Sequence, residues 1–265
     1  MEIRTVGVVG AGQMGNGIAH VFALAGFDVT LNDISQEALD RAVEIVANNL
    51  DRQVGRGKLE QSARDAALAR ISTTATLADL GPSDLIIEAA TEREDIKHAI
   101  FAELAPHLGP QTILTSNTSS ISITRLASRT DRPERFMGFH FMNPVPIMQL
   151  VELIRGIATD EATFKACHAV VERLGKTSAT AEDFPAFIVN RILMPMINEA
   201  IYTLYEGDGG QEAARVTIRL NSSGEGFADL LGHEADMVLS QREVNSRERV
   251  MAYEAGMGDL RSGRQ

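Results

Sequence analysis

The amino-acid sequence predicts an α/β protein in which a doubly wound, mainly parallel sheet domain is followed by a smaller all-α C-terminal domain. Two observations carry this prediction. Short apolar segments alternate with amphipathic helical segments over the first 183 residues, which is typical of parallel strands joined by helical crossovers. The remaining residues contain helical patterns and no convincing strand pattern. We therefore expect two domains, formed by residues 1–183 and 184–265.

The elements follow from their hydrophobic patterns, taken in order along the chain. Short apolar runs bounded by small or polar residues predict strands, and apolar residues spaced three to four apart predict helices. The predicted strands are residues 5–10, 27–32, 84–89, 112–115, 136–141 and 176–181. The predicted helices are residues 13–26, 35–59, 94–108, 121–128 and 161–174, and a long helix over residues 186–205 opens the second domain.

The composition is that of a soluble globular protein. Of the 265 residues, 44% are hydrophobic and 23% are charged, and no apolar run approaches the roughly 20 residues that cross a bilayer. The net charge of −11 argues against general binding to nucleic acid or anionic membranes, because such binding depends on Lys and Arg. The first strand begins almost at Met1, which leaves no room for a targeting peptide, so we expect a cytoplasmic location. The single cysteine, Cys167, lies in a helical pattern and is expected to serve packing.

A glycine-rich turn connects the first predicted strand to the first predicted helix. It reads Gly10-Ala11-Gly12-Gln13-Met14-Gly15 and matches the pattern G-x-G-x-x-G. In that pattern the first glycine permits a tight turn, the second lets a pyrophosphate approach the backbone, and the third lets helix and strand pack closely. The amide groups that begin the helix then bind the phosphates. The turn therefore predicts a Rossmann-type dinucleotide site.

Asp33 indicates which dinucleotide binds. It follows the second predicted strand, at about the 20-residue separation at which an acidic residue accepts hydrogen bonds from the ribose 2′-hydroxyl. A carboxylate at this place repels a 2′-phosphate, and no arginine follows in residues 34–36. The sequence therefore predicts NAD rather than NADP. A glycine turn alone is a weak signal, but the strand, the helix and the acidic residue around it favour a cofactor site.

His140 is the strongest candidate for a catalytic base. Oxidation of a secondary alcohol needs a group that takes the hydroxyl proton, and histidine suits this near neutral pH. Of the six histidines, only His140 ends a strand at the carboxyl edge of the predicted sheet, where doubly wound folds bind ligands. Glu152 follows on a second extended segment and would orient the imidazole and stabilise its protonated form. These parts predict an alcohol dehydrogenase that uses no metal.

Four segments of the chain resemble the motifs of one enzyme family. They are residues 10–19 (GAGQMGNGIA), residues 116–120 (SNTSS), residues 138–152 around His140, and residues 185–191 (PAFIVNR). In order and spacing they resemble the L-3-hydroxyacyl-CoA dehydrogenases, which include the bacterial 3-hydroxybutyryl-CoA dehydrogenases, over residues 1 to about 206. The resemblance implies reversible, NAD-dependent oxidation of a (3S)-3-hydroxyacyl-CoA to the 3-ketoacyl-CoA.

The resemblance also implies roles for side chains at the reacting centre. His140 matches the family's catalytic base and Glu152 its partner. Ser119 and Asn190 match polar side chains that hydrogen-bond the reacting oxygen and help to place the substrate. Simpler explanations exist for both: Ser119 could cap the helix that begins near residue 121, and Asn190 could be a buried amide that meets backbone. The shared spacing favours the functional roles.

Further residues match binding positions of the family. Contacts to the cofactor are implied for Glu92, Lys97 and Asn117, and also for Ser119. Arg56, with Lys58 beside it, lies where the family has a basic residue that meets the CoA moiety, so both are expected to bind substrate. A solvated, charged helix end would explain these two residues equally well.

The chain departs from the family pattern after Glu206. Residues 222–226 (SSGEG) replace a Met-Gly-Pro segment, and Arg261 stands where the family has a lysine near the cofactor. The family's helical domain closes over the substrate and forms the dimer interface, so the resemblance implies a homodimer and a cofactor contact by Arg261. A shortened, polar tail offers less apolar surface for closure and for dimerisation.

Three functions are compatible with this sequence. The first is an NAD-dependent 3-hydroxyacyl-CoA dehydrogenase. The second keeps the same base and cofactor but oxidises a small hydroxy acid; the basic group around Arg56 favours CoA instead. The third is a catalytically weak NAD-binding or structural protein, which the altered tail favours and the complete set of side chains around His140 opposes.

Overall fold

The computed structural model of the protein describes residues 2–207. The chain divides into two compact units, Met1–Met194 and Pro195–Gln265, and the whole sheet belongs to the first unit. The domain boundary that we expect after residue 183 stays a prediction. Within residues 2–207, no helix combines the length and the apolar character that a membrane crossing requires. The same residues contain no cluster of three or more His, Cys, Asp or Glu side chains that could hold a metal ion.

The elements of residues 2–207 have the following bounds. The strands are β1 (Thr5–Val9), β2 (Asp28–Asn32), β3 (Ile71–Thr74), β4 (Leu85–Glu88), β5 (Ile113–Ser116), β6 (Phe136–Phe141), β7 (Leu150–Arg155) and β8 (Thr177–Glu182). The α-helices are α1 (Gln13–Leu24), α2 (Gln36–Gly55), α3 (Gln61–Ala69), α4 (Glu94–Leu104), α5 (Ile123–Ala127), α6 (Glu161–Arg173) and α7 (Val189–Gly207). Short 3₁₀ helices are η1 (Leu77–Leu80), η2 (Ala105–His107) and η3 (Pro133–Arg135).

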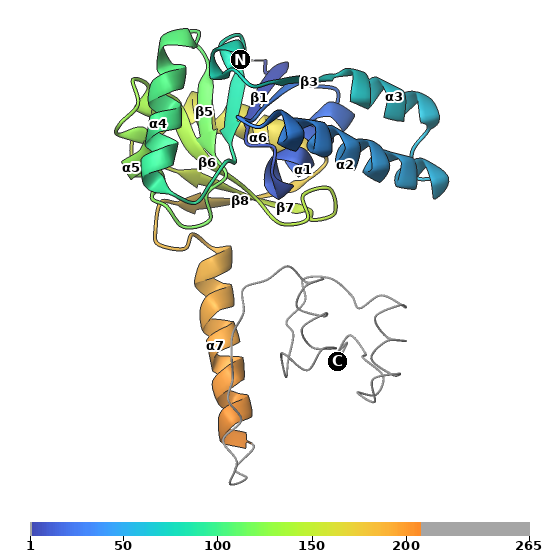
Figure 1. The fold of residues 1–265 in the computed structure, drawn as a ribbon. Helices are drawn as coiled ribbons and strands as arrows, with labels where there is room; N and C mark the ends of the chain where they lie inside the picture. The colour runs from blue at the N-terminus through green and yellow to red at the C-terminus, as the bar shows by residue number, and fades with distance from the viewer. Residues whose placement is uncertain (1, 208–265) are drawn as a thin grey trace. The chain divides into compact units, whose positions relative to one another are not determined.

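The sheet confirms the expected doubly wound, mainly parallel architecture. Its strand order is β3-β2-β1-β4-β5-β6-β7-β8, and every neighbouring pair is parallel except β6 and β7. Figure 1 shows helices on both faces of this sheet. The strand order reverses between β1 and β4, and folds of this kind bind ligands outside the carboxyl ends of the strands at such a point.

Two apolar clusters hold the helices on the sheet. The first joins α1, α2 and α6 to one face and includes Phe22, Leu39 and Val170. The second joins α4 and α5 to the opposite face of the sheet and includes Phe101 and Leu126. These residues recur at helical spacing in the sequence, which is why the helices were predictable. Helices thus cover both faces of the sheet, and the carboxyl ends of its strands remain available for a ligand site.

Cys167 lies fully buried within the first cluster, as its helical pattern predicts. Burial raises the pKa of its thiol far above the ordinary value, so the thiolate form is scarce near neutral pH. Cys167 therefore packs the core.

The region of residues 60–83 holds elements that the hydrophobic patterns do not predict. It contains α3 and the edge strand β3, which reads ISTT and buries none of its side chains fully. A four-residue edge strand with polar residues carries almost no period-two signal. Tertiary pairing with β2, rather than local pattern, makes this segment a strand.

Candidate active site

The glycine turn has the geometry that a dinucleotide requires. Gly10 has a φ of +98°, and a Cβ atom there would lie 2.6 Å from the Cα of Ala90. A Cβ on Gly15 would lie 1.7 Å from the Gly10 carbonyl oxygen, so helix and turn can approach only without side chains. Gly12, by contrast, has open space around it and begins α1 without a side-chain cap. The start of α1 therefore presents backbone amides to an anion, and the turn fits the pyrophosphate of NAD.

Asp33 lies beside this turn. Its Oδ2 atom accepts a hydrogen bond from the Ala11 amide at 2.8 Å, and its Oδ1 atom accepts one from the Ser35 amide at 3.0 Å. The Gly10 amide donates to the Asn32 carbonyl at 2.7 Å, which ties the turn to the end of β2. Each carboxylate oxygen keeps acceptor capacity for a ribose hydroxyl. The structure thus brings Asp33 and the glycine turn together.

His140 and Glu152 form a buried pair across the antiparallel strands β6 and β7. They are direct register partners, and the His140 Nδ1 atom lies 2.7 Å from Glu152 Oε2. Only 6% of His140 and 0% of Glu152 is exposed. Because an ionised carboxylate can only accept, the ring proton lies on Nδ1 and the Nε2 atom is left with a lone pair. His140 is therefore held in the tautomer that a base needs.

The other oxygen of Glu152 keeps the carboxylate ionised. Oε1 accepts hydrogen bonds from the Ile188 and Val189 amides, each at 2.9 Å, where α7 begins. Burial acts to raise the pKa of Glu152, but the hydrogen bonds from His140, Val189 and Ile188 outweigh it, and the pKa lies below its ordinary value. A charged carboxylate beside the ring stabilises the imidazolium that forms when His140 takes a proton.

Ser119 and Asn190 complete the group around His140. The Ser119 hydroxyl lies 3.0 Å from His140 Nε2 and can donate to it. The Asn190 side-chain amide donates to the Ser119 carbonyl at 3.1 Å. Asn117 also belongs here, because its Oδ1 atom accepts from the Phe141 amide at 2.8 Å, next to His140. Ser119 thus joins chain segments that lie 21 and 71 residues away from it, through its hydroxyl to His140 and through its carbonyl to Asn190.

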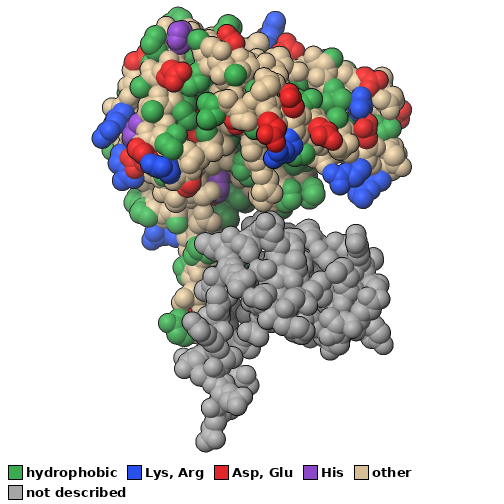
Figure 2. All heavy atoms as spheres, in the orientation of Figure 1, with side chains coloured by type: hydrophobic (Ala, Val, Ile, Leu, Met, Phe, Trp, Pro, Cys, Tyr) green, Lys and Arg blue, Asp and Glu red, His purple; other side chains and the backbone are tan. Residues whose placement is uncertain are grey.

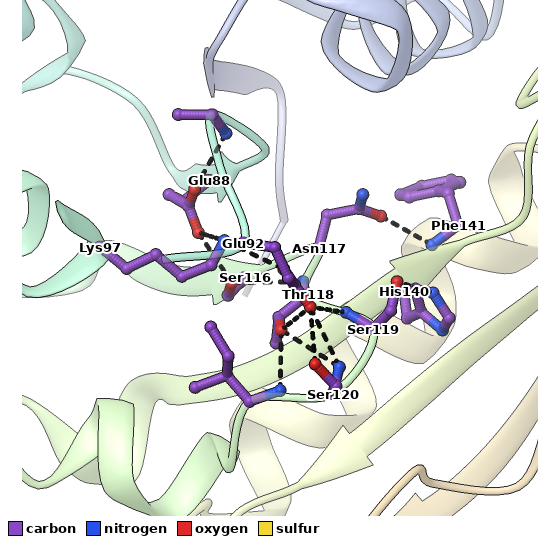
Figure 3. Close-up of polar contacts among 12 residues, drawn as sticks. Glu88, Glu92, Lys97, Ser116, Asn117, Thr118, Ser119, Ser120, His140 and Phe141 are labelled. Atoms are coloured by element: carbon purple, nitrogen blue, oxygen red, sulfur yellow. Dashed lines mark hydrogen bonds and ion pairs between the residues drawn. The ribbon is translucent and has the colours of Figure 1, made fainter. Parts of the chain in front are cut away.

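Glu92 holds the segment that carries Ser119 (Figure 3). Its Oε1 atom accepts from the Thr118 hydroxyl at 2.7 Å, from the Ser119 amide at 2.8 Å, and from both the amide and the hydroxyl of Ser120 at 3.1 Å. Ser119 is therefore held through its backbone by one carboxylate oxygen, while its hydroxyl meets His140.

Lys97 is paired with a residue that sequence reasoning missed. Only 1% of Lys97 is exposed, and its Nζ atom donates to Glu88 Oε2 at 2.5 Å; Glu92 Oε2 lies 3.9 Å away. Glu88 ends β4 and also accepts from the Ser116 hydroxyl at 2.8 Å. The hydrophobic pattern assigns Glu88 only to a strand. A glutamate that ends a buried apolar run is nevertheless a usable signal, because such a carboxylate needs a buried partner.

Arg56 and Lys58 lie apart from this group. Both are exposed in the turn between α2 and α3, and basic side chains are visible on the lobe that these helices form in Figure 2. Within residues 2–207, the hydrogen bonds around His140 do not extend to either residue. Arg261, the remaining predicted cofactor contact, lies outside the described residues.

Comparison with known proteins identifies the family. The family model for the 3-hydroxyacyl-CoA dehydrogenase NAD-binding domain matches residues 5–184. A 3-hydroxybutyryl-CoA dehydrogenase of Bradyrhizobium diazoefficiens is 60% identical over 220 residues, which are 83% of this chain and 75% of the relative. A probable 3-hydroxybutyryl-CoA dehydrogenase of Bacillus subtilis is 42% identical over 263 residues, 98% of this chain and 88% of the relative.

A solved structure agrees with these relatives. The crystal structure of (S)-3-hydroxybutyryl-CoA dehydrogenase from Ralstonia eutropha matches with a TM-score of 0.76 and 46% identity, over 88% of this chain and 78% of that one. The chain, with its NAD-binding sheet domain, belongs to the 3-hydroxyacyl-CoA dehydrogenase family.

Proposed function

We propose that this protein is an NAD-dependent dehydrogenase that oxidises (3S)-3-hydroxyacyl-CoA to 3-ketoacyl-CoA and also catalyses the reverse reduction. Family membership supports the reaction class and the cofactor. One observation of the chain itself carries the proposal: Ser119, His140 and Glu152 form a continuous hydrogen-bonded series at the carboxyl edge of the sheet. The relatives' names favour 3-hydroxybutyryl-CoA as the substrate.

His140 acts as the base in this proposal. Its Nε2 atom takes the proton of the substrate hydroxyl, and the resulting imidazolium is stabilised by Glu152 on the opposite ring nitrogen. In the reduction the same atom returns the proton. NAD, when bound, supplies the hydride acceptor. The buried environment of the pair strengthens this electrostatic stabilisation, because little water competes for the charges.

Ser119 and Asn190 place the reacting oxygen. One substrate oxygen can reach both His140 Nε2 and the Ser119 hydroxyl, since these two groups lie only 3.0 Å apart. Asn190, tied to the Ser119 carbonyl, supports that position from α7. The Ser119 hydroxyl can donate to this oxygen and so stabilise the negative charge that develops on it as its proton leaves.

The cofactor site is proposed at the glycine turn. Residues 10–15 would bind the pyrophosphate, and Asp33 would bind the adenosine ribose, which selects NAD over NADP. Glu92, Lys97 and Asn117 are proposed as further residues of the cofactor site. They would act through the segment of residues 116–120, to which they belong or which they help to hold. Arg56 and Lys58 are proposed to meet the phosphates of CoA, which their exposed positive charges suit.

A homodimer is proposed as the working assembly. In the described part of α7, the side chains of Ile192, Met194, Met196 and Tyr202 are exposed. Apolar side chains gathered on one helix are typical of surfaces that another chain covers. The cytoplasmic location remains a prediction.

One assay separates the three functions. NADH consumption is followed with acetoacetyl-CoA, with acetoacetate and with no substrate. We expect NADH to be consumed with acetoacetyl-CoA only. Equal rates with acetoacetate would favour a small hydroxy acid as substrate, and NADH binding without any consumption would favour the catalytically weak NAD-binding protein.

A further inference from the structure

Glu88 is a buried carboxylate to which the reaction as proposed gives no task. It ends β4, where it pairs with Val9 of β1 on one side and with Ser116 of β5 on the other. None of its surface is exposed. Burying a charged carboxylate is costly unless hydrogen bonds and an opposite charge compensate for it. Its three partners therefore indicate what the residue does.

Those partners belong to three different segments at the carboxyl edge of the sheet (Figure 3). Glu88 Oε1 accepts from the Ala90 amide at 2.9 Å. Glu88 Oε2 accepts from the Lys97 ammonium at 2.5 Å and from the Ser116 hydroxyl at 2.8 Å. One carboxylate thus connects the turn after β4, the helix α4 and the end of β5.

Two of these connections lead to the segment of residues 116–120, which carries Ser119. The Ser116 hydroxyl accepts from the Thr118 amide at 3.3 Å. Lys97 lies 3.9 Å from Glu92 Oε2, and the other oxygen of Glu92 accepts from the Ser119 amide at 2.8 Å. The Lys97 ammonium therefore lies between two carboxylates, and its charge attracts the Glu92 oxygen that residues 118–120 leave free.

The third connection leads to the glycine turn. The Ala90 backbone, fixed by Glu88, is the surface against which Gly10 packs, since a Cβ on Gly10 would meet the Ala90 Cα atom at 2.6 Å. A shift of Ala90 would therefore move the wall behind the turn that we propose for the pyrophosphate.

We propose that Glu88 is a positioning residue for hydride transfer: it sets the segment of residues 116–120, and with it Ser119, relative to both His140 and the glycine turn. The inference rests on the proposed function. It differs from a purely stabilising role, in which Glu88 would only neutralise the buried Lys97. If the carboxylate becomes an amide, Lys97 keeps a single charged neighbour, Glu92, and draws it away from the backbone amides of residues 118–120.

The experiment compares Glu88→Gln with a matched control at Asp84, the residue just before the same strand. Asp84→Asn changes a carboxylate at the opposite end of the β4 region, where Asp84 Oδ2 accepts from the Arg4 and Thr5 amides at 2.8 and 2.9 Å. Both variants lose one charge and keep their shape, but only Glu88 lies at the carboxyl edge. Hydrogen exchange of residues 116–120 is measured in protein without cofactor, and kcat and KM are measured with NADH and acetoacetyl-CoA.

For Glu88→Gln we expect exchange in residues 116–120 to be faster by about ten-fold, which matches the loss of a charge-assisted hydrogen bond. We expect kcat to fall by about 100-fold while KM changes little, because misplacement of a reacting group lowers the rate more than the binding. Glu88→Asp, which keeps the charge, should recover part of both losses. Asp84→Asn should change neither quantity, even where it lowers Tm.

The proposal is overturned if Glu88→Gln matches Asp84→Asn in both exchange and kcat. If Glu88→Gln does not fold, Glu88→Asp is compared with Asp84→Asn in the same two measurements. Its shorter side chain moves the carboxylate oxygens away from their hydrogen-bond partners. Absence of turnover in the unmodified protein would overturn the proposed function instead. The exchange comparison would still decide the role of Glu88 in that event.

Discussion

His140 and Glu152 stand directly opposite each other on antiparallel strands, and a 2.7 Å hydrogen bond joins Nδ1 of the one to Oε2 of the other. β6 and β7 are the one antiparallel pair in the sheet of residues 2–207. Register partners on neighbouring strands carry their side chains on the same face of the sheet, which places the carboxylate beside the imidazole.

Replacing His140 by glutamine should abolish turnover and leave NADH binding nearly unchanged. Glutamine fills a similar volume but cannot take the hydroxyl proton, and loss of a general base costs at least about 100-fold in rate. NADH binding is measured by fluorescence and turnover with acetoacetyl-CoA. His168→Gln, on the outer side of α6, is the control and should keep full activity. Turnover retained by the His140 variant would remove this residue from the role of base.

Replacing Glu152 by glutamine should lower kcat by about three orders of magnitude, because the imidazolium loses its charged partner and the ring its fixed tautomer. The variant should also be less stable, since one amide oxygen cannot accept from both His140 and the start of α7. Glu161→Gln, which removes an exposed ion pair with Arg155, serves as the control for kcat and Tm. Wild-type kcat in the Glu152 variant would contradict the proposed role.

Replacing Asp33 by serine should weaken NADH binding by about ten-fold and reduce the preference for NADH over NADPH. The variant loses the carboxylate that repels a 2′-phosphate and the acceptor that holds the Ala11 amide. Dissociation constants for NADH and NADPH, measured by fluorescence titration, give both effects. Tighter binding of NADPH than of NADH by the unmodified protein would already refute the assignment of NAD.

Protonation of His20 should lower the stability of the folded protein in mild acid. Burial, assisted by the charge of Lys176, lowers the pKa of His20 from 6.5 to about 4, and its Nδ1 atom has no hydrogen-bond partner. The unfolded chain binds this proton below pH 6.5, whereas the folded chain binds it only near pH 4. The free energy of unfolding should therefore fall by about 3 kcal/mol as the pH drops through this window.

Urea denaturation at pH 7 and pH 4.5 measures this effect. His20→Gln should show a smaller loss of stability between the two pH values, by about 2–3 kcal/mol, because glutamine does not titrate. An identical loss in both proteins would mean that other groups dominate the acid response.

Replacing Ala186 by glycine should stabilise the protein. Ala186 has a φ of 68°, in the left-handed region, and Phe187 follows with a φ of 51°. Relief of this strain should exceed the added entropy of the unfolded chain and raise the free energy of unfolding by about 0.5–1 kcal/mol. Ala66→Gly, at an exposed position inside α3, should have the opposite sign. Urea midpoints of both variants provide the test.

The sheet and the pair of His140 and Glu152 could be predicted because each depends on local signals. Apolar runs mark the buried strands, and the histidine closes one of them at an edge where ligands bind. Ser119 and Asn190 were reachable only through resemblance, since their meeting depends on contacts 71 residues apart in the chain. Glu88 could not be given a role, because the meaning of a buried carboxylate lies in its partners, which three separate segments supply.

The two oxygens of Glu152 have a consequence for shortening the chain. One faces His140, and the other is held by amides of residues 188 and 189, which follow the predicted domain boundary at residue 183. A protein truncated at that boundary would keep the complete sheet and the glycine turn, yet leave this carboxylate without two of its three donors. The truncated sheet domain should thus still bind the dinucleotide. Its imidazole, beside a carboxylate that is no longer fixed, should no longer transfer a proton effectively.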